Sequence, residues 1–467
     1  MKKILISVIS IVFIVGIVWA AMFYWNNLRG AKTAISPPTE DIVKTINTTG
    51  MPLTLPAGFS IEILAKDLAG ARVLVFDNEG NAWVSQTSTG VITKLEIQNG
   101  KVISQNAVFR NLNKPHGLAF DPEAPNILYV AEEDKISKLR LGSEAKPEKI
   151  ISLSASGGHF TRTIGFGPDG RLYVSIGSSC NVCHEKNEQR AKIFSLNKDG
   201  SDFKEYARGL RNSVFFIWHQ GPAGQSPDGS SLEAGKKMWA TEMGRDLLGD
   251  NIPPDEINIV EAGKNYGWPI CYGQNIHDDE FDHNTYIRNP CMEPFEQSSA
   301  IDLQAHSAPL GLAFLENKTW PKEYQGNLFV AFHGSWNRTT PTGYMLVRIP
   351  FLNGAPTSPV DFITGWLKDG AKYGRPVDVV VKDEAMYVTD DSAGVVYKIT
   401  YNAPQKAATC HPTGCSGQIC ADEDVITTCE YKESFACYKK AKCERHKNGQ
   451  CAWTLTSELL QCLGGKL

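Results

Sequence analysis

The sequence predicts an all-β fold, a six-bladed β-propeller. Six short segments carry an aromatic residue, usually a valine and then a small residue, most of them just after a turn marked by glycine or proline. They begin at Trp83, Tyr129, Tyr173, Trp239, Phe329 and Tyr387. The first two separations, 46 and 44 residues, match the length of a four-stranded blade. A strand-turn-strand unit repeated at this period is typical of a β-propeller.

Residues 1–27 are predicted to be a membrane anchor or a signal segment. Lys2 and Lys3 precede an uncharged run, residues 4–27, that is long enough to cross a bilayer as a transmembrane helix. The basic flank would stay in the cytoplasm, so the rest of the chain would be exported to the periplasm or the cell exterior. Cleavage near Ala20 and Ala21 is the alternative, and it would make the protein secreted.

Residues 28–52 are rich in threonine, proline and asparagine and are predicted to be a linker. The strand pattern begins with residues 59–65, where apolar and polar side chains alternate. We expect this strand to complete the last blade and so to close the ring. The propeller would then cover residues 53–401.

Two inserted loops separate the later repeats, whose spacings grow to 66, 90 and 58 residues. These loops, residues 221–237 and 266–306, account for most of the excess over one blade length. Cys271 and Cys291 are close enough in sequence to staple the second loop. Such a crosslink would contribute about 3 kcal/mol to stability.

The carboxyl-terminal residues 410–462 are predicted to form a small disulfide-rich module. Eight of the 12 cysteines lie there, an even count that is typical of four disulfides in an oxidising compartment. A zinc site with His411 and His446 is the alternative, but the irregular spacings match no common zinc pattern. Helical periodicity outside the amino-terminal segment is confined to the region near residues 433–443.

Two polar motifs precede the third and fourth repeats. Gly157 and Gly158 let the backbone pass close to a ligand, and His159, a natural general base near neutral pH, follows at once. Arg211 beside Asn212 offers a planar cation and an amide, which suit carboxylates and carbonyl groups. The alternatives are a histidine that only fixes a loop and an arginine in a salt bridge between blades.

An acidic and glycine-rich stretch follows the fourth repeat, in residues 242–246 and 253–258. Hard oxygen ligands on a backbone bent by glycine and proline are suited to calcium. The spacing matches no EF-hand loop, and a solvated acidic loop is the alternative.

The segment Cys180-Asn181-Val182-Cys183-His184 has the form of a c-type haem attachment motif. It directly follows a predicted strand of the third repeat, whereas haem needs a second axial ligand and usually a small helical domain. We therefore interpret the two cysteines as a disulfide or a redox-inert pair on a loop.

With these motifs in place, residues 53–401 resemble the family of sorbosone dehydrogenases and soluble glucose dehydrogenases. The stretches that carry the resemblance, in the family's order, are residues 157–170, 209–212, 254–258, 263–269, 333–338 and 374–379. The Cys-Asn-Val-Cys element is also typical of the sorbosone branch. Members are six-bladed propellers that use pyrroloquinoline quinone (PQQ) with calcium. The tail resembles an eight-cysteine module found on exported bacterial proteins.

The resemblance implies a role for each matching residue. His159 would take the proton from the C1 hydroxyl of a sugar as hydride passes to the quinone, which makes it catalytic. Arg211 would be catalytic as well as cofactor-binding, because it would lie with Asn212 against PQQ and stabilise charge on its oxygens.

The resemblance also implies the metal and carboxylate ligands. Backbone carbonyls of Gly244 and Arg245 would bind Ca²⁺, which would polarise the quinone. Because PQQ carries three carboxylates, further cations are needed, and Arg338 and Arg375 are the candidates. The glucose dehydrogenases place a lysine against the cofactor where this chain has residues 333–338, and Met243 and Arg245 also depart from their pattern. Glucose itself is therefore not implied.

We therefore expect a PQQ- and calcium-dependent dehydrogenase that oxidises a sugar or related aldehyde and passes electrons to an unknown acceptor. A calcium-dependent lactonase is one alternative, although it would need axial Glu, Asn and Asp ligands and no arginine cluster. A non-catalytic binding propeller displayed at the membrane is another. The net charge of −4 is small and no basic stripe is present, so nucleic acid is not an expected partner.

Overall fold

The computed structural model describes residues 45–142, 147–155, 157–221, 235–292 and 296–402, and a tail. In the tail, residues 409–464 are described except for 423, 426, 428, 430, 431 and 447–450. The chain divides into one unit of residues 44–403 and another of residues 1–43 with 404–467. Within the described ranges, no helix is both long and apolar enough to cross a bilayer. The predicted anchor, residues 1–27, lies outside these ranges.

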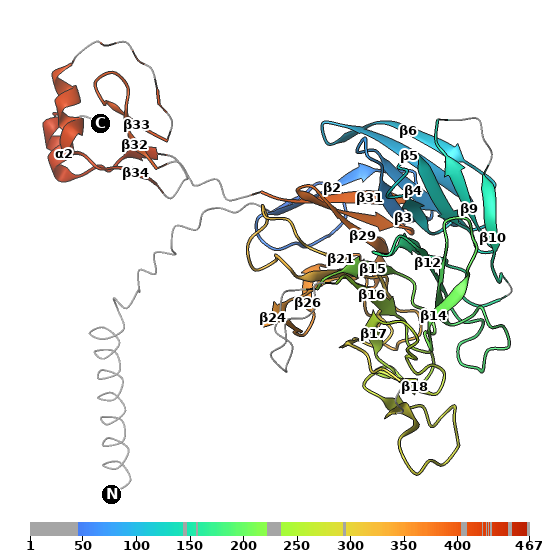
Figure 1. Ribbon diagram of the computed structural model, residues 1–467. Helices are drawn as coiled ribbons and strands as arrows, with labels where there is room; N and C mark the ends of the chain where they lie inside the picture. Colours follow the sequence, from blue (N-terminus) through green and yellow to red (C-terminus); the bar gives the residue numbers. More distant parts are fainter. Residues whose placement is uncertain are drawn as a thin grey trace, which may run out of the picture. The chain divides into compact units, whose positions relative to one another are not determined.

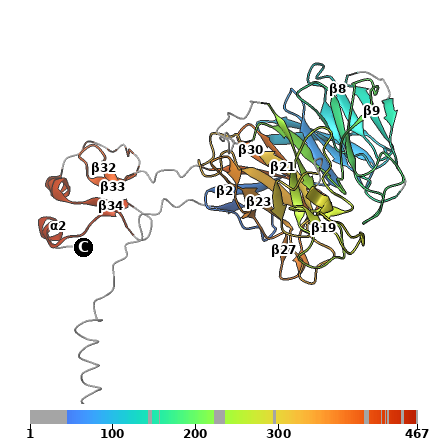
Figure 2. The same cartoon turned by 60° about the horizontal axis from the view of Figure 1, so that its bottom comes forward.

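Six sheets of the described residues, antiparallel except for one short strand added to blade 6, form the blades of a propeller, which confirms the predicted fold (Figures 1 and 2). Blade 1 contains β3 (Ala71–Phe76), β4 (Ala82–Gln86), β5 (Val91–Gln98) and β6 (Lys101–Phe109). Blade 2 contains β7 (Leu118–Phe120), β8 (Ile127–Ala131), β9 (Lys135–Arg140) and β10 (Glu148–Ser152). Blade 3 contains β11 (Ile164–Phe166), β12 (Leu172–Ile176), β13 (Lys192–Leu196) and β14 (Lys204–Arg208).

The remaining blades are interrupted by longer connections. Blade 4 contains β15 (Phe216–His219), β16 (Lys237–Glu242), β17 (Asp255–Val260) and β20 (Ile301–Leu303). Blade 5 contains β21 (Pro309–Phe314), β22 (Leu328–Phe332), β23 (Met345–Ile349) and β26 (Val360–Ile363). Blade 6 contains β29 (Pro376–Lys382), β30 (Ala385–Asp390), β31 (Val395–Tyr401) and, from the other end of the unit, β2 (Phe59–Ala65).

Each of the six sequence repeats is the second strand of a blade. Neighbouring residues of a strand face opposite sides of its sheet, yet both the aromatic residue and the residue after it are buried in every repeat. In β4, for example, Trp83 and Val84 are both buried. Both faces are covered because each blade packs between two others, which explains the run of apolar residues.

In four of the six repeats the small residue is a serine or threonine whose hydroxyl links one blade to the next. Ser85 donates to the carbonyl of His116 at 2.8 Å, and Thr241 donates to that of Leu310 at 2.8 Å. In each case the acceptor lies at or just before the first strand of the following blade. A small hydroxyl side chain therefore donates to a buried carbonyl of the next blade.

Strand β2 closes the ring by pairing with β31, as predicted. Figure 1 shows β2 beside β31. The antiparallel register runs from Phe59 opposite Tyr401 to Ala65 opposite Val396. The predicted end of the linker was wrong, since residues 45–52 pack on the propeller. There β1 (Ile46–Asn47) pairs in parallel with β2, and the Asn47 amide donates to the carbonyls of Met51 and Leu53. These side-chain bonds hold a segment whose composition is that of a linker.

The insertion of blade 4 carries a short hairpin, β18 (Cys271–Tyr272) and β19 (Ile276–His277), and the 3₁₀ helix η2 (Pro290–Met292). The predicted Cys271–Cys291 disulfide is present and staples this insertion. Two further short hairpins lie in the connections of blade 5 and between blades 5 and 6. They are β24 (Phe351–Leu352) with β25 (Ala355–Pro356) and β27 (Leu367–Lys368) with β28 (Ala371–Lys372).

The tail forms the predicted disulfide-rich module, and its eight cysteines pair with one another instead of forming a zinc site. The pairs are Cys410–Cys451, Cys415–Cys429, Cys420–Cys443 and Cys437–Cys462. The described elements are β32 (His411–Thr413), β33 (Ile419–Ala421), η3 (Glu433–Lys440), β34 (Cys443–Arg445), β35 (Cys451–Trp453) and α2 (Ser457–Cys462). The helical pattern expected near residues 433–443 corresponds to η3, whereas α2 was not predicted.

Replacing Thr389 with valine tests the hydroxyl contact at the closure between blades 6 and 1. Thr389 donates to the Arg72 carbonyl at 2.5 Å and accepts from the Asp378 amide at 2.9 Å. Because valine keeps the shape but leaves both buried groups unpaired, the free energy of unfolding should fall by about 1–3 kcal/mol. Thr400→Val is the matched control, since no hydrogen bond of the Thr400 hydroxyl is found in the described residues. Equal denaturation midpoints for the two variants would contradict the role of Thr389.

Candidate functional site

A cavity of about 200 Å³ lies where loops of four blades meet. Arg72 enters it from the start of blade 1 and His159 from the segment before blade 3. Asn212 comes from the segment before β15, and His333 from the end of β22. The ring thus brings His159 and Asn212, which were predicted as site residues, to one cavity.

His159 is held in the tautomer that a general base needs. Its Nδ1 lies 3.0 Å from both the carbonyl oxygen and Oγ of Ser178. Since a carbonyl oxygen only accepts, the ring proton resides on Nδ1 and Nε2 keeps its lone pair. Burial, and next the positive charge of Arg211, lower the pKa of His159 to about 3. The ring is therefore neutral at physiological pH.

Two buried arginines shape the loop that carries His159. Arg162 donates to the carbonyls of His159 and Thr161 at 2.9 and 2.7 Å, and Arg190 donates to the His159 carbonyl at 3.0 Å. Both side chains are fully enclosed. Arg162 and Arg190 thus fix the backbone of the His159 loop by donating hydrogen bonds to its carbonyl oxygens.

Arg211, which precedes Asn212, does not line this cavity but lines a smaller one in blade 4, and it is held by the disulfide loop of blade 3. The Cys180–Cys183 disulfide is present, as the sequence interpretation expected. Within this loop the Asn181 carbonyl and Oδ1 accept from Arg211 Nε and Nη2, both at 2.8 Å. Asp246 accepts from Arg211 Nη2 at 2.9 Å, and its own amide donates to Asn181 Oδ1 at 2.7 Å. The guanidinium is therefore fixed on several sides, and Asn181 is a positioning residue that the sequence analysis missed.

Next to this cluster, three carboxylates of blade 4 are buried together. Glu242 accepts from the Asn212 amide at 2.8 Å through Oε1, while its Oε2 is buried without a partner. Burial raises the pKa values of Asp255 to about 6 and of Glu256 to about 7, and it raises the pKa of Glu242 well above its usual range. A buried carboxylate oxygen without a partner is costly, which makes this a place for a cation.

The predicted metal-binding segment lies beside these acids. Gly244 and Arg245 line a small cavity, of about 20 Å³, together with Glu242 and Glu256. The Gly244 carbonyl accepts from Arg211 Nη1 at 2.9 Å, and the Arg245 side chain pairs with Asp278 at 2.7 Å. The Arg245 guanidinium is thus committed to the insertion of blade 4, which leaves only its backbone available to a metal.

The other two predicted cofactor cations, Arg338 and Arg375, do not line the cavity. Arg375 donates to the carbonyls of His333 and Gly334 at 3.1 and 2.7 Å and so supports the His333 wall from behind. Arg338 donates instead to the Ala305 carbonyl at 3.1 Å and to Asn251 at 3.2 Å. The loop after β22 directs Arg338 toward the loops of blade 4. The position of Arg338 in the sequence motif did not predict this direction.

Arg72 is the cation at the cavity that the sequence analysis missed. Its Nη1 donates to Asp391 Oδ2 at 2.8 Å, and Asp391 Oδ1 accepts from His333 Nε2 at 2.9 Å. Burial lowers the pKa of His333 to about 4, although Asp391 opposes this shift. This triad joins blades 1, 5 and 6 and exists only because the ring is closed. No local motif surrounds Arg72, so no sequence signal was available.

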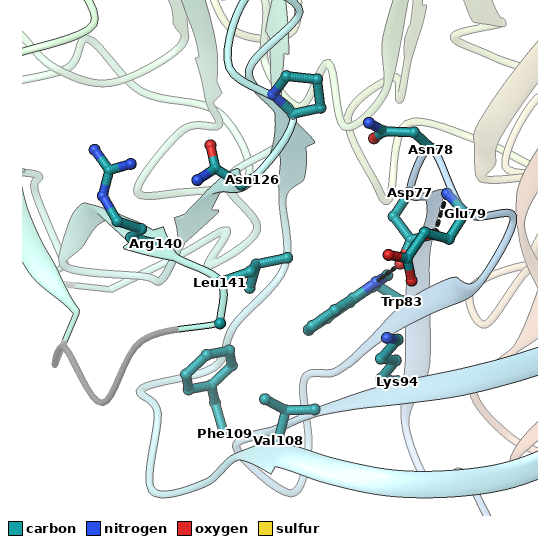
Figure 3. Close-up of a pocket in the computed structure, with 12 residues that line it drawn as sticks. Asp77, Asn78, Glu79, Trp83, Lys94, Val108, Phe109, Asn126, Arg140 and Leu141 are labelled. Carbon is teal, nitrogen blue, oxygen red and sulfur yellow. Dashed lines mark hydrogen bonds between the residues drawn. The ribbon is translucent and has the colours of Figure 1, made fainter.

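A wider cavity, of about 700 Å³, lies between blades 1 and 2 and contains none of the predicted site residues. Figure 3 shows Trp83 and Phe109 of blade 1 facing Asn126 and Leu141 of blade 2. The Trp83 indole donates to Asp77 Oδ2 at 3.0 Å and so ties the turn between β3 and β4 to the blade. Trp83, the aromatic residue of the first repeat, therefore has a structural role in this cavity.

Comparison with known proteins places this geometry in a family. A family model described as TrAA12-like matches residues 53–402. The chain belongs to the TrAA12-like family. A second model, described as a CGP-CTERM domain protein, matches residues 389–466 and so includes the cysteine-rich tail.

Individual relatives agree with this assignment. The chain is 31% identical over 371 residues to an uncharacterized protein of Borreliella burgdorferi, covering 75% of this chain and 91% of that one. It is 25% identical over 401 residues to the PQQ-dependent pyranose dehydrogenase of Coprinopsis cinerea, covering 73% of this chain. The match covers 54% of that relative, so the chain spans about half its length.

A solved structure confirms the fold independently. The holo form of the PQQ domain of the Coprinopsis cinerea pyranose dehydrogenase aligns with a TM-score of 0.60 at 20% identity, over 76% of this chain and 100% of that domain. This structural likeness supports the six-bladed ring. Together with the sequence relatives it confirms the predicted resemblance to PQQ-dependent sugar dehydrogenases.

Asn181→Ala tests whether the disulfide loop holds Arg211 in place. The change removes the Oδ1 acceptor of Arg211 Nη2 and of the Asp246 amide, and both donors are largely buried. The free energy of unfolding of the propeller should therefore fall by about 1–3 kcal/mol. Asn106→Ala, which removes one exposed hydrogen bond to Ser104, should change it by less than about 0.5 kcal/mol. Urea titration checks both values, and equal effects would argue against the role of Asn181.

Proposed function

We propose that the propeller is a PQQ- and calcium-dependent dehydrogenase that oxidises a sugar or a related aldehyde. One observation carries the proposal: a neutral His159, with Nε2 unprotonated, lines one cavity with Asn212, and Arg211, the residue before Asn212, is close enough for its charge to lower the pKa of His159. A base can take the hydroxyl proton of an alcohol, and an amide and a fixed cation can stabilise the negative charge that develops, while the hydride needs a separate acceptor, which PQQ would supply.

The residues present fit PQQ, which carries three carboxylates. Arg72 lines the cavity, and its Nε is buried without a partner. Arg211 is buried and donates to the Gly244 carbonyl. Arg375 donates to the carbonyls of His333 and Gly334. Arginine suits planar carboxylates, so this chain offers cations where a tricarboxylate needs them. Arg72 replaces Arg338 as the better candidate at the cavity itself.

The residues also fit a calcium ion. Asp255 and Glu256 each accept two or more hydrogen bonds from the protein, and only Glu242 Oε2 lacks a partner among the three acids. A hard cation held by this oxygen and by carbonyls of the Gly244–Arg245 segment would compensate the buried negative charge. Glu242 is thus a calcium-ligand candidate in addition to the two predicted from sequence.

In this mechanism the protein supplies a base and a fixed positive charge. PQQ, when bound, would supply a two-electron oxidant, and a calcium ion would supply a Lewis acid beside it. His159 Nε2 takes the hydroxyl proton of the substrate, while Nδ1–H stays on the Ser178 carbonyl and keeps the ring oriented. Arg211 and Asn212 stabilise the negative charge that develops on oxygen. Because Asn181 and Asp246 already hold Arg211, this stabilisation needs little reorganisation.

The alternatives fit the geometry less well. A calcium-dependent lactonase would not need the buried arginines that surround His159. A non-catalytic binding propeller would not need a free Nε2 on a ring held by Ser178. Six disulfides in the described residues support an exported protein in an oxidising compartment. Attachment to the membrane through residues 1–27 is part of the proposal, and the electron acceptor is unknown.

Reconstitution tests the proposed activity. Full-length protein supplied with PQQ and Ca²⁺ should reduce an electron-accepting dye in the presence of an aldose. His159→Ala should lower turnover by about 10²–10⁴-fold while PQQ stays bound, as judged by its visible absorption. His283→Ala, an exposed histidine of the blade 4 insertion, is the matched control and should leave turnover unchanged. If no aldose supports dye reduction and the protein binds no PQQ, the proposed dehydrogenase activity is refuted.

The pH dependence of turnover follows from the state of His159. Its pKa of about 3 lies below the ordinary value of histidine, so the ring loses its proton well below neutral pH and remains a base above that. With PQQ loaded, kcat/KM should therefore stay flat from pH 8 down to about pH 5 and decline only at lower pH. Intrinsic fluorescence over the same range controls for unfolding. An acid limb centred near the ordinary histidine pKa would show that His159 is not the base or is not buried during turnover.

A further inference from the structure

The disulfide loop of blade 3, residues 177–185, contacts both groups that the proposed mechanism uses. Toward His159, the Ser178 carbonyl accepts from the His159 amide at 2.9 Å and from its Nδ1 at 3.0 Å. Toward Arg211, the Ser178 amide donates to the Arg211 carbonyl at 2.7 Å, and Asn181 accepts from the guanidinium at 2.8 Å. One loop therefore positions the proposed base and the cation at the same time.

The backbone of Cys180 lies between these two sets of contacts. Ser178 Oγ donates to the Cys180 carbonyl at 2.6 Å, and Asn181 is the next residue along the chain. Glu185 closes the loop by accepting from the amide and the hydroxyl of Ser179 at 2.5 and 2.7 Å. A displacement of Cys180 would therefore disturb Ser178 and Asn181 together.

The segment that carries His159 packs tightly on the disulfide loop. Gly158 has a φ of +63°, and a Cβ atom there would lie 2.4 Å from the Ser178 carbonyl oxygen. A Cβ atom on Gly177 would lie 2.8 Å from His159 Cβ. Because no gap separates the two segments, a movement of the disulfide loop would be transmitted to His159.

The Cys180–Cys183 bond is the covalent constraint on this loop. The loop lies between β12 and β13, and residues 177–191 contain neither strand nor helix. The bond joins positions only three apart, whereas Cys271–Cys291 joins positions 20 apart. Since a crosslink across a short loop constrains the unfolded chain less, breaking Cys180–Cys183 should alter the loop while the propeller stays folded.

The two disulfides of the described propeller residues also differ in burial. Cys180 and Cys183 are half-buried, whereas Cys271 and Cys291 are buried. Thiol–disulfide exchange requires a thiolate to reach one sulfur of the bond. A dithiol should therefore open Cys180–Cys183 before it opens Cys271–Cys291.

We propose that Cys180–Cys183 is a redox-sensitive switch of the site formed by His159 and Arg211. A dithiol, either a small molecule or a protein, passes two electrons and two protons to the bond. The Cys180–Cys183 bond breaks into two thiols, and the two S–H groups of the dithiol become a disulfide. Once the loop is released, Ser178 no longer orients His159 and Asn181 no longer holds Arg211. The resulting loss of PQQ affinity rests on the proposed function, whereas the loosening of the loop does not.

Hydrogen exchange in the full-length, PQQ-free protein tests the loosening. In the double variant Cys180→Ser with Cys183→Ser, the amides of His159 and Ser178 should exchange about tenfold faster or more, because both donate within this contact. The matched control is Cys437→Ser with Cys462→Ser, which removes a disulfide of the tail and should leave both amides unchanged. Unaltered exchange of the β12 amides shows that the propeller remains folded.

Reduction of the wild-type protein tests reversibility and does not depend on the folding of a variant. PQQ-free protein is equilibrated with mixtures of reduced and oxidised dithiothreitol and then freed of them. One part is alkylated, so that mass spectrometry counts the open cysteines, and the other is analysed by hydrogen exchange and titrated with PQQ and Ca²⁺. The Kd for PQQ should rise about tenfold or more as Cys180 and Cys183 open, with Cys271 and Cys291 still paired. Reoxidation should restore the original Kd and the slow exchange.

The outcomes separate the switch from the proposed function. The switch is overturned if Cys180–Cys183 opens only together with Cys271–Cys291. It is also overturned if opening leaves the exchange of the His159 and Ser178 amides unchanged, or if oxidised and reduced protein bind PQQ equally well. If the oxidised protein binds no PQQ, the proposed function fails. Faster exchange that reverses on reoxidation then still supports redox control of the His159 and Arg211 loops, and its absence overturns the switch as well.

Discussion

The pairing of β2 with β31 is the constraint on which the rest of the propeller depends. It joins the two ends of the unit through a hydrogen-bonded register from Phe59 to Ala65. Closure places blade 6 against blade 1, where Thr389 reaches the Arg72 carbonyl and Asp391 reaches the Arg72 guanidinium. An open ring would lose both contacts at once. The wall of the candidate site that Arg72 forms is therefore a product of ring closure.

The strands provide a fixed frame, and the segments between them carry the functional groups. Asp246 shows how these segments are joined. It accepts from Arg211, which precedes β15, and from Asn337, which follows β22, while its backbone bonds to Asn181 after β12. One acidic residue thereby links loops of three blades. Side chains that lie far apart in sequence are held together by such shared partners, which explains why a site of this kind can be rigid although it is built on loops.

The sequence predicted the features that local chemistry determines. The repeats, the closing strand and the Cys271–Cys291 disulfide depend on short patterns, and all were found as expected, whereas the pairing of the eight tail cysteines was not predicted beyond their number. Arg72 was missed because its place depends on contacts between residues about 300 positions apart in the chain. Asn181 was overlooked inside a motif that was interpreted for its cysteines alone. Helix α2 did have a signal, since Thr456 caps it and Glu458 follows in the first turn.

The arginines that shape the His159 loop also determine its chemistry. Arg162 and Arg190 are buried against carbonyl oxygens, and burial, with the charge of Arg190 next, lowers the pKa of Arg162 to about 10. Arg162 therefore remains protonated at neutral pH. Burial first, then the charge of Arg211 and more weakly those of Arg190 and Arg162, lowers the pKa of His159, whose Nδ1 is already committed to Ser178. Cations that are buried for structural reasons thus add to the effect of burial in keeping the neighbouring histidine neutral. Replacing either arginine with a neutral residue would alter the loop and the basicity of His159 together, so the fold and the proposed chemistry of this site cannot vary independently.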